Sequence, residues 1–480
     1  MTDLPVRFDV RAPLPSLGEL GHVHLIAVGG AGMSGVAALL LDRGLVVSGS
    51  DARASAVLES LRARGADVAV GHDPRHLDGV DTVVVSSAIR DDNVELAAAR
   101  ARGLRVLHRS QALAVLMAGS RRVAVAGASG KTTTTSMLAV ALAAAGADPA
   151  FAGGGEIPQL GASARWGEGG VFVVEADESD GSFLVYRPEI AVVTNVQPDH
   201  LDFYGTVERV QEAYAAFVAS VADGGLLVAC HDDAGSRGLA AQATSLGRRV
   251  LTYGFDAGAD LRVTSSEAVG LGSRSTMRVG GADLELVLAV PGRHNVLDAA
   301  AAYLAATAGV GLSPAAALAG LATFAGARRR FEVMGERGGV TVVDDYAHNP
   351  AKVAAVVATA RSVLSRAGGG RLHVVFQPHL YSRTRDFAAE FAAALAEADT
   401  VALLDVYGAR EDPMPGVSSE LIGGPLRERH GSSGVTVGEP HDVVVARVAA
   451  AAAPGDLVVT VGAGDVTTLA PRILAALEAR

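Results

Sequence analysis

The chain has 480 residues, of which 49% are hydrophobic and one is a cysteine, and its formal net charge is −11 at pH 7. This length predicts about three domains of ordinary size, the acidic balance argues against general nucleic-acid binding, and the single Cys230 excludes an intramolecular disulfide and an all-cysteine zinc site. Because charges or glycines interrupt every apolar run before the roughly 20 residues that span a bilayer, and because the polar start does not resemble an export signal, we expect a cytoplasmic protein without membrane insertion.

The first predicted domain covers residues 1–118 and has a Rossmann-like α/β fold. Short apolar strands alternate with helical stretches between His22 and Arg109. This alternation is typical of a parallel sheet that helices cover on both faces. The predicted strands are VHLIAV, VVSGSD, VDTVVVSSAI and LRVLH.

A glycine-rich turn follows the first of these strands and precedes a helix. Such a turn can hold an anion at the helix N-terminus, and Asp51 follows the next strand, as in dinucleotide-binding domains. The literal fingerprint is incomplete, because Ala27 stands where its first glycine would be. A redox dinucleotide and a substrate linked to a nucleotide diphosphate both satisfy this turn, so the sequence leaves the two open. The residues of the turn are Gly29, Gly30, Gly32, Ser34 and Gly35.

The second predicted domain covers residues 119–325 and is a P-loop-type ATPase core with an antiparallel addition. Its opening strand runs into GASGKT, a shortened P-loop in which Val125 replaces the usual first glycine. Backbone amides of such a turn surround phosphates, Lys131 reaches the outer phosphates and the Thr132 hydroxyl can ligate magnesium. The further strands are VFVVE, IAVVT and LLVAC, and the alternating, glycine-paired stretch from Leu261 to Val290 predicts hairpins.

Acidic residues and a histidine follow two strands of this domain, where ligand sites of parallel sheets cluster. Glu175 comes directly after its strand and is our predicted magnesium ligand. The remaining carboxylates of EADESD, including Glu178, are either solvated loop charges or groups that orient a substrate. His200 is a predicted second metal ligand, although a single loop histidine often has no such role.

The third predicted domain covers residues 326–480 and again alternates strands and helices in a Rossmann-like pattern. Its strands are expected at VTVVDDY, LHVVFQP, DTVALLDVY and DLVVTVG. Arg330, within ARRRFE, suits a developing phosphoryl charge or a carboxylate. Further polar residues stand at strand ends and suit an anionic group; they are Asp345, His348, His379, Arg383 and Arg385.

Nine short motifs in fixed order make the chain resemble the three-domain Mur ligases, ATP-dependent amide-forming enzymes of cell-wall precursor synthesis. The motifs are GGAGMSG, GASGKTTTT, EADESD, TNVQPDHLD, PGRHN, RRFE, DDYAHNP, FQPHLYSRT and GAGDV. The resemblance extends from about residue 22 to residue 470. GGAGMSG and FQPHLYSRTRDF favour the member that joins L-alanine to UDP-N-acetylmuramate.

The resemblance implies the substrates UDP-N-acetylmuramate, L-alanine and ATP, with Mg²⁺, in a monomer or weak homodimer. ATP would phosphorylate the lactyl carboxylate and the amine would attack the acyl phosphate, with His348 as the hypothetical general base. The implied catalytic residues are Lys131, Glu175, His200, Arg330 and His348, and the implied metal ligands are Thr132, Glu175 and His200. The implied ATP-binding residues are Gly127, Ala128, Ser129, Gly130, Lys131, Thr132, Thr133, His294, Asn295, Asp298, Arg330 and Asp345. The implied UDP-sugar residues are Gly29, Gly30, Ala31, Gly32, Met33, Ser34, Asp51, Ser86 and Ser87, and the amino-acid residues are Tyr346, His348, His379, Arg383 and Arg385.

The chain departs from the family pattern at several of these motifs. Ser129 stands where the family commonly has a histidine, Asp298 replaces a frequent asparagine, and Asn349 and Leu380 alter the amino-acid motifs. Three alternatives stay open. They are a relative that attaches a whole peptide to the same UDP-sugar, a nucleotide-gated partner protein without catalysis, and a nicotinamide-dependent oxidoreductase. The last of these leaves Lys131 and Glu175 without a role.

Overall fold

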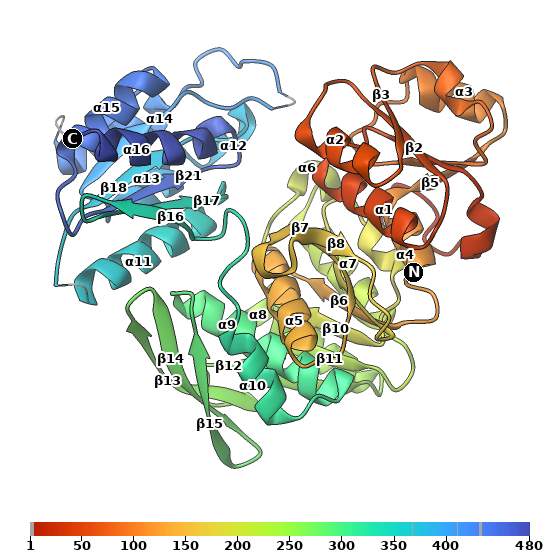
Figure 1. Cartoon of the computed structure of the whole chain (residues 1–480). Coiled ribbons are helices and arrows are strands. Elements are labelled where there is room, and N and C mark those ends of the chain that lie inside the picture. Colours follow the sequence, from red (N-terminus) through yellow and green to blue (C-terminus); the bar gives the residue numbers. More distant parts are fainter. Residues whose placement is uncertain (1–3, 367, 410, 432–433) are drawn as a thin grey trace. The chain divides into compact units, whose positions relative to one another are not determined.

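The computed structural model describes residues 4–366, 368–409, 411–431 and 434–480. Three separate sheets, each with its own helices, confirm the predicted three-domain α/β class (Figure 1). The predicted boundaries at residues 118 and 325 stay a prediction. By compactness the chain divides into two units: unit 1 comprises Met1–Ser265, Thr276–Leu286 and Leu297–Phe324, and unit 2 comprises Ser266–Ser275, Val287–Val296 and Ala325–Arg480. Among the described residues, no helix combines the length and apolarity that crossing a bilayer requires.

The N-terminal sheet has the order β3-β2-β1-β4-β5, and every neighbouring pair is parallel. This is the predicted Rossmann-like arrangement, with β3 as an additional edge strand. All residues of β1 are buried because helices cover the sheet on both faces. The elements are η1(Leu17–Leu20), β1(Val23–Ile26), α1(Ala31–Asp42), β2(Val47–Asp51), α2(Ala56–Ala63), β3(Asp67–Val70), η2(Pro74–Leu77), β4(Thr82–Val85), α3(Val94–Ala101), β5(Arg105–His108) and α4(Arg109–Leu116).

A buried carboxylate with several imidazole neighbours lies inside this domain. Glu95, in the first turn of α3, has no exposed side-chain surface, and His24 of β1 lies 3.8 Å from it. Burial alone raises the pKa of Glu95, but His24, Ser50, His76 and a backbone amide more than offset this and hold the pKa below its ordinary value. The hydrogen-bond partners of Glu95 are Ser50 at 2.5 Å, His72 at 3.0 Å, His76 at 2.7 Å and the Asp73 amide at 3.2 Å.

The central sheet has the order β15-β14-β13-β12-β11-β10-β6-β9-β7-β8. Its middle strands β6, β9, β10 and β11 are parallel, as predicted for a P-loop core. Two-residue glycine turns connect β13 to β14 and β14 to β15, which gives the predicted hairpins (Figure 1). The elements are β6(Arg121–Ala126), α5(Lys131–Ala144), β7(Ala150–Ile157), η3(Pro158–Leu160), β8(Ala162–Arg165), β9(Val171–Glu175), η4(Ser182–Val185), β10(Ile190–Val193), α6(Leu201–Tyr204), α7(Val207–Ala219), β11(Leu226–Cys230), α8(Ala234–Ser245), β12(Arg249–Gly254), β13(Leu261–Val269), β14(Gly272–Val279), β15(Ala282–Leu288), α9(Arg293–Leu304), the π-helix η5(Ala305–Val310) and α10(Pro314–Ala322).

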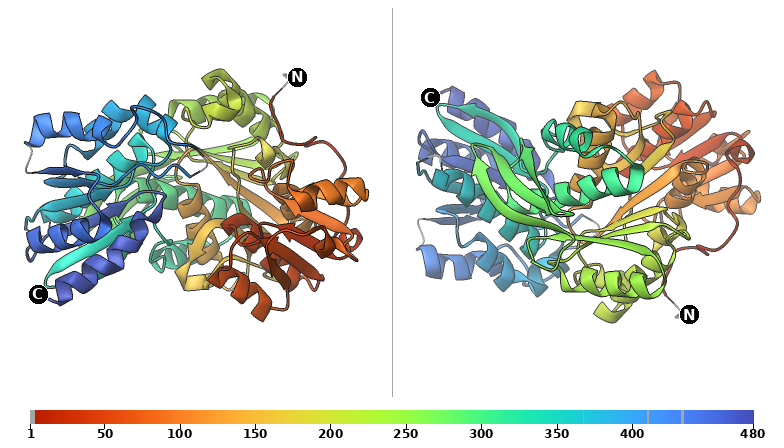
Figure 2. Two further views of the ribbon diagram at one scale, coloured as in Figure 1. Left: turned by 90° about the horizontal axis from the view of Figure 1, so that it is seen from above. Right: turned by 90° about the horizontal axis from the view of Figure 1, so that it is seen from below.

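The C-terminal sheet has the order β16-β17-β21-β18-β19-β20, with β16 antiparallel to an otherwise parallel sheet. One apolar core lies beneath α11 and α13 and a second beneath α15 and α16, so both faces are covered (Figure 2). The elements are β16(Glu332–Arg337), β17(Val340–Asp345), α11(Pro350–Arg366), β18(Leu372–Phe376), α12(Tyr381–Asp386), α13(Ala388–Leu395), β19(Thr400–Leu403), α14(Glu420–His430), β20(Val435–Val437), α15(His441–Ala451), β21(Leu457–Val461), η6(Asp465–Thr468) and α16(Leu469–Glu478).

The Glu95 cluster gives a pH-dependent stability prediction. We expect Glu95→Gln to lower the free energy of unfolding of the N-terminal domain by about 1–3 kcal/mol at pH 7, because buried donors lose their charged acceptor. The folded-state pKa is lowered, so this stabilisation is present above the unfolded-state pKa of roughly 4.3 and is lost as the pH falls through the folded-state value. Urea titration with hydrogen exchange of peptides from residues 22–108 measures the difference at each pH.

Glu59→Gln is the matched control, because Glu59 forms an exposed pair with Arg62 on α2. We expect it to change stability by less than about 0.5 kcal/mol at any pH. A Glu95→Gln deficit that stays constant from pH 7 to pH 3 would contradict the assigned charge.

Candidate functional site

The turn between β6 and α5 needs its two glycines. Gly127 and Gly130 have φ of +140° and +86°, a backbone region that L side chains rarely adopt. A Cβ atom at Gly127 would overlap the hydroxyl of Thr194, and one at Gly130 would lie 2.5 Å from a carboxylate oxygen of Asp298. The turn is therefore packed tightly against the segment after β10 and against α9.

Asn195, which the sequence analysis did not single out, fixes the conformation of this turn. Its side chain accepts a hydrogen bond from the Ser129 amide at 3.0 Å and donates to the Ser129 carbonyl at 2.9 Å. Its carbonyl accepts from the Ala128 amide at 3.2 Å. These two amides, which we expected to face a phosphate, donate to Asn195 in this structure. The TN pair directly after a buried strand was the available signal.

Lys131 forms a buried ion pair with Glu178. The Nζ atom lies 2.7 Å and 3.0 Å from the two carboxylate oxygens and also donates to the Gly127 carbonyl at 2.7 Å. The two side chains are 13% and 2% exposed. Burial alone lowers the pKa of Lys131, but Glu178, Asp177 and Glu175 outweigh it and raise the pKa, so the amine is charged at neutral pH. Glu178 is thus a buried partner of the P-loop lysine, and the interpretation as a solvated loop charge is excluded.

The predicted metal ligands of the central domain lie beside this pair. The Thr132 hydroxyl donates to Glu175 at 3.1 Å, and the other oxygen of Glu175 accepts from the Gly154 amide at 2.6 Å. His200 Nε2 lies 3.7 Å from Glu178. Within the part of the chain that the structure describes, no group of three His, Cys, Asp or Glu side chains is arranged to hold a metal ion. The hydroxyl and carboxylate of Thr132 and Glu175 nevertheless fit magnesium, which usually takes few protein ligands and keeps several waters.

The first glycine turn connects β1 to α1 and also requires an unusual backbone. Ala27, at the position of the missing fingerprint glycine, has φ of +58°, so alanine adopts the left-handed conformation there. Asp51 accepts a hydrogen bond from the Gly29 amide at 2.9 Å. Met33 is buried in the hydrophobic core. Gly30 caps α1, which begins at the predicted residue Ala31 and places Gly32 and Ser34 in its first turn.

The predicted serine pair follows β4 and reaches the acidic loop of the central domain. The Ser87 hydroxyl donates to Asp180 and lies 3.0 Å from His108 Nε2. Both domains belong to unit 1, so unit 1 brings together the first turn, the serine pair and the loop after β9.

In unit 2, Asp345 at the end of β17 contacts the segment that precedes β16. Asp345 accepts hydrogen bonds from the amides of Phe331 at 2.8 Å and Ala347 at 2.7 Å. Burial raises the pKa of Asp345, although the charge of Arg330 and the two amides oppose the shift. The Arg330 guanidinium lies over the Tyr346 ring at 5.4 Å. These backbone contacts give Asp345 a structural role, and its predicted role at the ATP site stays a prediction.

Three aromatic side chains of unit 2 gather around His348. Tyr346 and His379 lie 5.1 Å and 5.9 Å from it between ring centroids, and Tyr407 stacks on His379 at 5.8 Å. The Nδ1 atom of His348 donates to the Tyr346 carbonyl at 2.9 Å, which leaves the Nε2 lone pair as acceptor. Burial, with the charges of Lys352 and Arg383, lowers the pKa of His348 to about 3. The ring is therefore neutral at pH 7.

The other predicted residues of unit 2 have diverse surroundings. Arg385 forms an exposed pair with the adjacent Asp386 at 2.6 Å, whereas Arg383 is half-buried. Asn295 is buried and its amide donates to the Pro291 carbonyl at 2.6 Å, while His294 is exposed. In unit 1, Asp298 accepts a hydrogen bond from the Thr134 hydroxyl at 3.2 Å and lies close to Gly130 of the P-loop.

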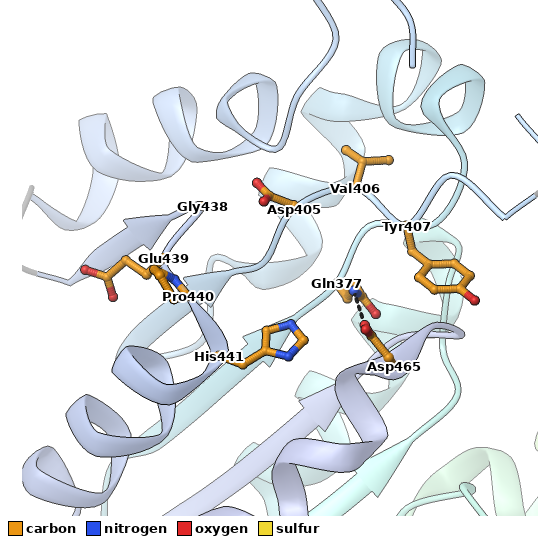
Figure 3. A pocket seen from close by; sticks show the side chains of 9 residues that line it. All are labelled: Gln377, Asp405, Val406, Tyr407, Gly438, Glu439, Pro440, His441 and Asp465. Atoms are coloured by element: carbon orange, nitrogen blue, oxygen red, sulfur yellow. Dashed lines mark hydrogen bonds between the residues drawn. The ribbon is translucent and has the colours of Figure 1, made fainter. Parts of the chain in front are cut away.

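A cavity of about 340 Å³ opens at the carboxyl ends of β18, β19 and β20 in unit 2 (Figure 3). Gln377 donates to Asp465 at 2.6 Å at its base. Because the carboxyl edge of a parallel sheet is where ligands bind, this cavity and the adjacent His379–Tyr407 stack form a candidate binding region. Asp405, Glu439 and His441 also line the cavity and were not predicted from the sequence.

Three family models match successive parts of the chain. They are the "Mur ligase family, catalytic domain" over residues 22–121, the "Mur ligase middle domain" over residues 125–306 and the "Mur ligase, glutamate ligase domain" over residues 329–464.

Named relatives match nearly the whole chain. The UDP-N-acetylmuramate–L-alanine ligase of Kineococcus radiotolerans is 54% identical over 472 residues, which cover 98% of this chain and 99% of the relative. That of Renibacterium salmoninarum is 52% identical, with 96% and 97% covered. Among solved structures, the UDP-N-acetylmuramate–alanine ligase of Thermotoga maritima has a TM-score of 0.79 at 27% identity, covering 95% of this chain and 99% of that one. A murein peptide ligase from Psychrobacter arcticus has a TM-score of 0.69 at 25% identity, with the same coverage.

The buried Lys131–Glu178 pair is testable by its effect on stability. We expect Glu178→Gln to lower the free energy of unfolding by about 3–5 kcal/mol, because the Lys131 ammonium then stays buried without its counter-charge. Replacing Lys131 by Met in the same background removes that charge and recovers part of the loss, so the two changes are strongly non-additive. Urea titrations of the single and double variants measure this coupling.

Asp283→Asn is the control, because Asp283 pairs with Arg278 at the surface at 2.7 Å. Its expected cost is at most about 0.5 kcal/mol. Additive losses in the Lys131→Met/Glu178→Gln variant would contradict a buried pair.

Proposed function

The chain belongs to the Mur ligase family, and we propose that it joins the amino group of L-alanine to the lactyl carboxylate of UDP-N-acetylmuramate while ATP is converted to ADP and phosphate. Identity above 50% over nearly the full length of the L-alanine ligases named above carries this proposal. The presence of two glycine turns in unit 1 supports it, since the reaction has two nucleotide-bearing substrates.

The proposed reaction proceeds through acyl activation. A carboxylate oxygen takes the terminal phosphoryl group of ATP and ADP leaves. The amine then attacks the carbonyl carbon of the acyl phosphate, phosphate departs with the electron pair of the C–O bond, and the amine loses a proton. Phosphoryl transfer of this kind depends on positioning and charge neutralisation more than on covalent help from the protein.

Unit 1 supplies the proposed ATP site. Lys131 is positively charged at neutral pH and can exchange its partner Glu178 for a phosphate oxygen. Thr132 and Glu175 would hold Mg²⁺, with His200 as the proposed ligand of a second ion, and magnesium supplies charge neutralisation on the nucleotide phosphates when bound. We assign the diphosphate of the UDP-sugar to the first turn around Gly30 and Gly32, at the N-terminus of α1.

We assign L-alanine to the aromatic cluster of unit 2. Tyr346, His348 and His379 provide a partly enclosed polar surface beside the half-buried Arg383, which suits the carboxylate of an amino acid. The Nε2 lone pair of His348 is our proposed proton acceptor for the attacking amine. A cytoplasmic location and a monomer or weak homodimer complete the proposal.

The proposed function predicts a strict dependence on all three substrates. We expect ADP and phosphate release only when ATP, UDP-N-acetylmuramate and L-alanine are present together, in a panel that omits each component and replaces L-alanine by glycine, L-serine or a peptide. Lys131→Ala should lower kcat/KM by at least about 10²–10³-fold, the usual cost of a lost charge-stabilising group. Phosphate release that does not depend on the amino acid would instead favour a nucleotide-gated protein. A preference for the peptide over L-alanine would favour the relative that attaches a whole peptide.

His348 gives a separate prediction about proton transfer. Because its pKa is about 3, the imidazole is neutral from pH 6 to 9. Its Nε2 lone pair can therefore accept a proton over this whole range. We expect His348→Gln to lower kcat by less than about 10²-fold, below the usual range of general-base contributions, because an imidazole of such low pKa is a weak proton acceptor. The ratio to wild type should be nearly constant across this pH range. An unchanged kcat, in a variant whose melting temperature is also unchanged, would remove His348 from the mechanism.

A further inference from the structure

Helix α4 lies at the contact between the two domains of unit 1. It packs against α1, which follows the first glycine turn, and against η4, which follows the acidic loop after β9. Its first residue, Arg109, and the residue before it, His108, therefore stand where the two nucleotide-binding regions meet. Neither residue was predicted from the sequence to have a role.

The Arg109 guanidinium touches both regions. A Cβ atom at Gly32 would overlap its Nη1 atom, so the guanidinium lies directly against the first turn. Its Nη2 atom is 3.8 Å from a carboxylate oxygen of Asp177, in the acidic loop. Arg109 is 25% exposed and Asp177 42% exposed, which makes this a loose pair that can be exchanged. One cation thus contacts both the first glycine turn and a carboxylate close in the chain to Glu175, the proposed metal ligand.

A hydrogen-bond chain next to this pair anchors the loop. The Ser110 amide donates to His108 Nδ1 at 3.3 Å, so Nε2 carries the ring proton and donates to Ser87 Oγ at 3.0 Å. The Ser87 hydroxyl in turn donates to Asp180. Since Asp180 is held by buried partners, Asp177 can lose Arg109 without release of the loop.

We propose that Arg109 is a positioning residue that couples the occupancy of the first turn to the affinity of the acidic loop for a divalent cation. The proposal rests on the function assigned above, with a diphosphate on the turn and Mg²⁺ beside Glu175. A diphosphate held at Gly32 attracts the guanidinium and draws its charge away from Asp177. Asp177 then has no arginine to neutralise it, so the loop is more negative and binds the cation more tightly. By linkage, the bound cation strengthens diphosphate binding by the same factor.

Other charges also face Asp177, and they set the size of the effect. Lys131 and His200 interact electrostatically with the same carboxylate. Lys131 stays paired with Glu178 and remains near Asp177. The loss of Arg109 therefore reduces the positive charge around Asp177 but does not abolish it. We therefore expect a modest coupling, of about threefold to fivefold in cation affinity, in line with a partly exposed charge pair.

The test is a binding titration that needs no turnover. Mn²⁺ serves as the probe cation, with free Mn²⁺ measured by electron paramagnetic resonance, in the presence and absence of saturating UDP. A titration of UDP without protein gives the Mn²⁺ that UDP itself binds, and this amount is subtracted. For the wild-type chain we expect UDP to raise Mn²⁺ affinity about threefold to fivefold. In Arg109→Gln the affinity without UDP should already equal the wild-type value with UDP and should not respond to it, while UDP binding itself weakens. A merely structural loss would instead weaken Mn²⁺ and UDP together.

Three further variants and a second ligand test the same coupling. Arg109→Lys keeps a positive charge and should retain part of the coupling, and Asp177→Asn should lower Mn²⁺ affinity and abolish the response to UDP. Arg100→Gln, which breaks an exposed pair with Asp91 in the same domain, is the control and should behave as wild type. UDP-N-acetylmuramate should couple no more strongly than UDP, since the diphosphate is the effective group. If it alone couples, the diphosphate proposal is overturned in favour of the lactyl carboxylate.

A wild-type Mn²⁺ affinity that does not depend on UDP, or an Arg109→Gln variant with normal coupling, would overturn the proposal. These outcomes differ from failure of the proposed function, which appears as the absence of amino-acid-dependent ADP release in the wild-type chain.

Discussion

The candidate site depends on one buried positive charge and the carboxylates that surround it. Lys131 is placed by the turn after β6, and Glu178 reaches it from the loop after the neighbouring strand β9. A buried ammonium is costly unless a carboxylate meets it closely, so the loop after β9 must adopt one conformation for unit 1 to be stable. The same requirement places Glu175 beside Thr132. The ion pair that stabilises the site is also the pair that a phosphate group would replace.

The parallel sheets explain why the candidate site residues of unit 1 lie in so few places. The strands of the N-terminal sheet end at one edge of that sheet, and the parallel core strands of the central sheet end at one edge of theirs, where turns lead into helices. Asp51 and Glu175 are the last residues of such strands, and Ser87, Lys131 and His200 lie in the segments that follow them. Residues far apart in the chain thus meet without any long-range sequence signal, and α4 then connects two of these edges through Arg109 and His108.

The sequence predicted the strands and residues whose local signal is strong. Buried central strands are continuous apolar runs, and glycine turns are visible because only glycine tolerates the backbone of Gly127 and Gly130. It missed the edge strands β3, β8, β16 and β20, and also β7, next to an edge strand, and β12, between the parallel core and the hairpins. Exposed residues interrupt the apolar pattern in several of these strands. It also undervalued Glu178 and did not identify Asn195, since their partners lie 47 and 66 residues away in the chain.

The sequence by itself therefore determined the three-domain α/β class, the two phosphate-type turns and the family, because each rests on short contiguous patterns that local backbone physics makes specific. Only the tertiary structure decided which charges are paired, which imidazoles are neutral and which residues join one domain to the next. Those properties depend on burial and on distances of a few ångströms between side chains that the chain brings together from separate segments. No contiguous stretch of residues encodes them.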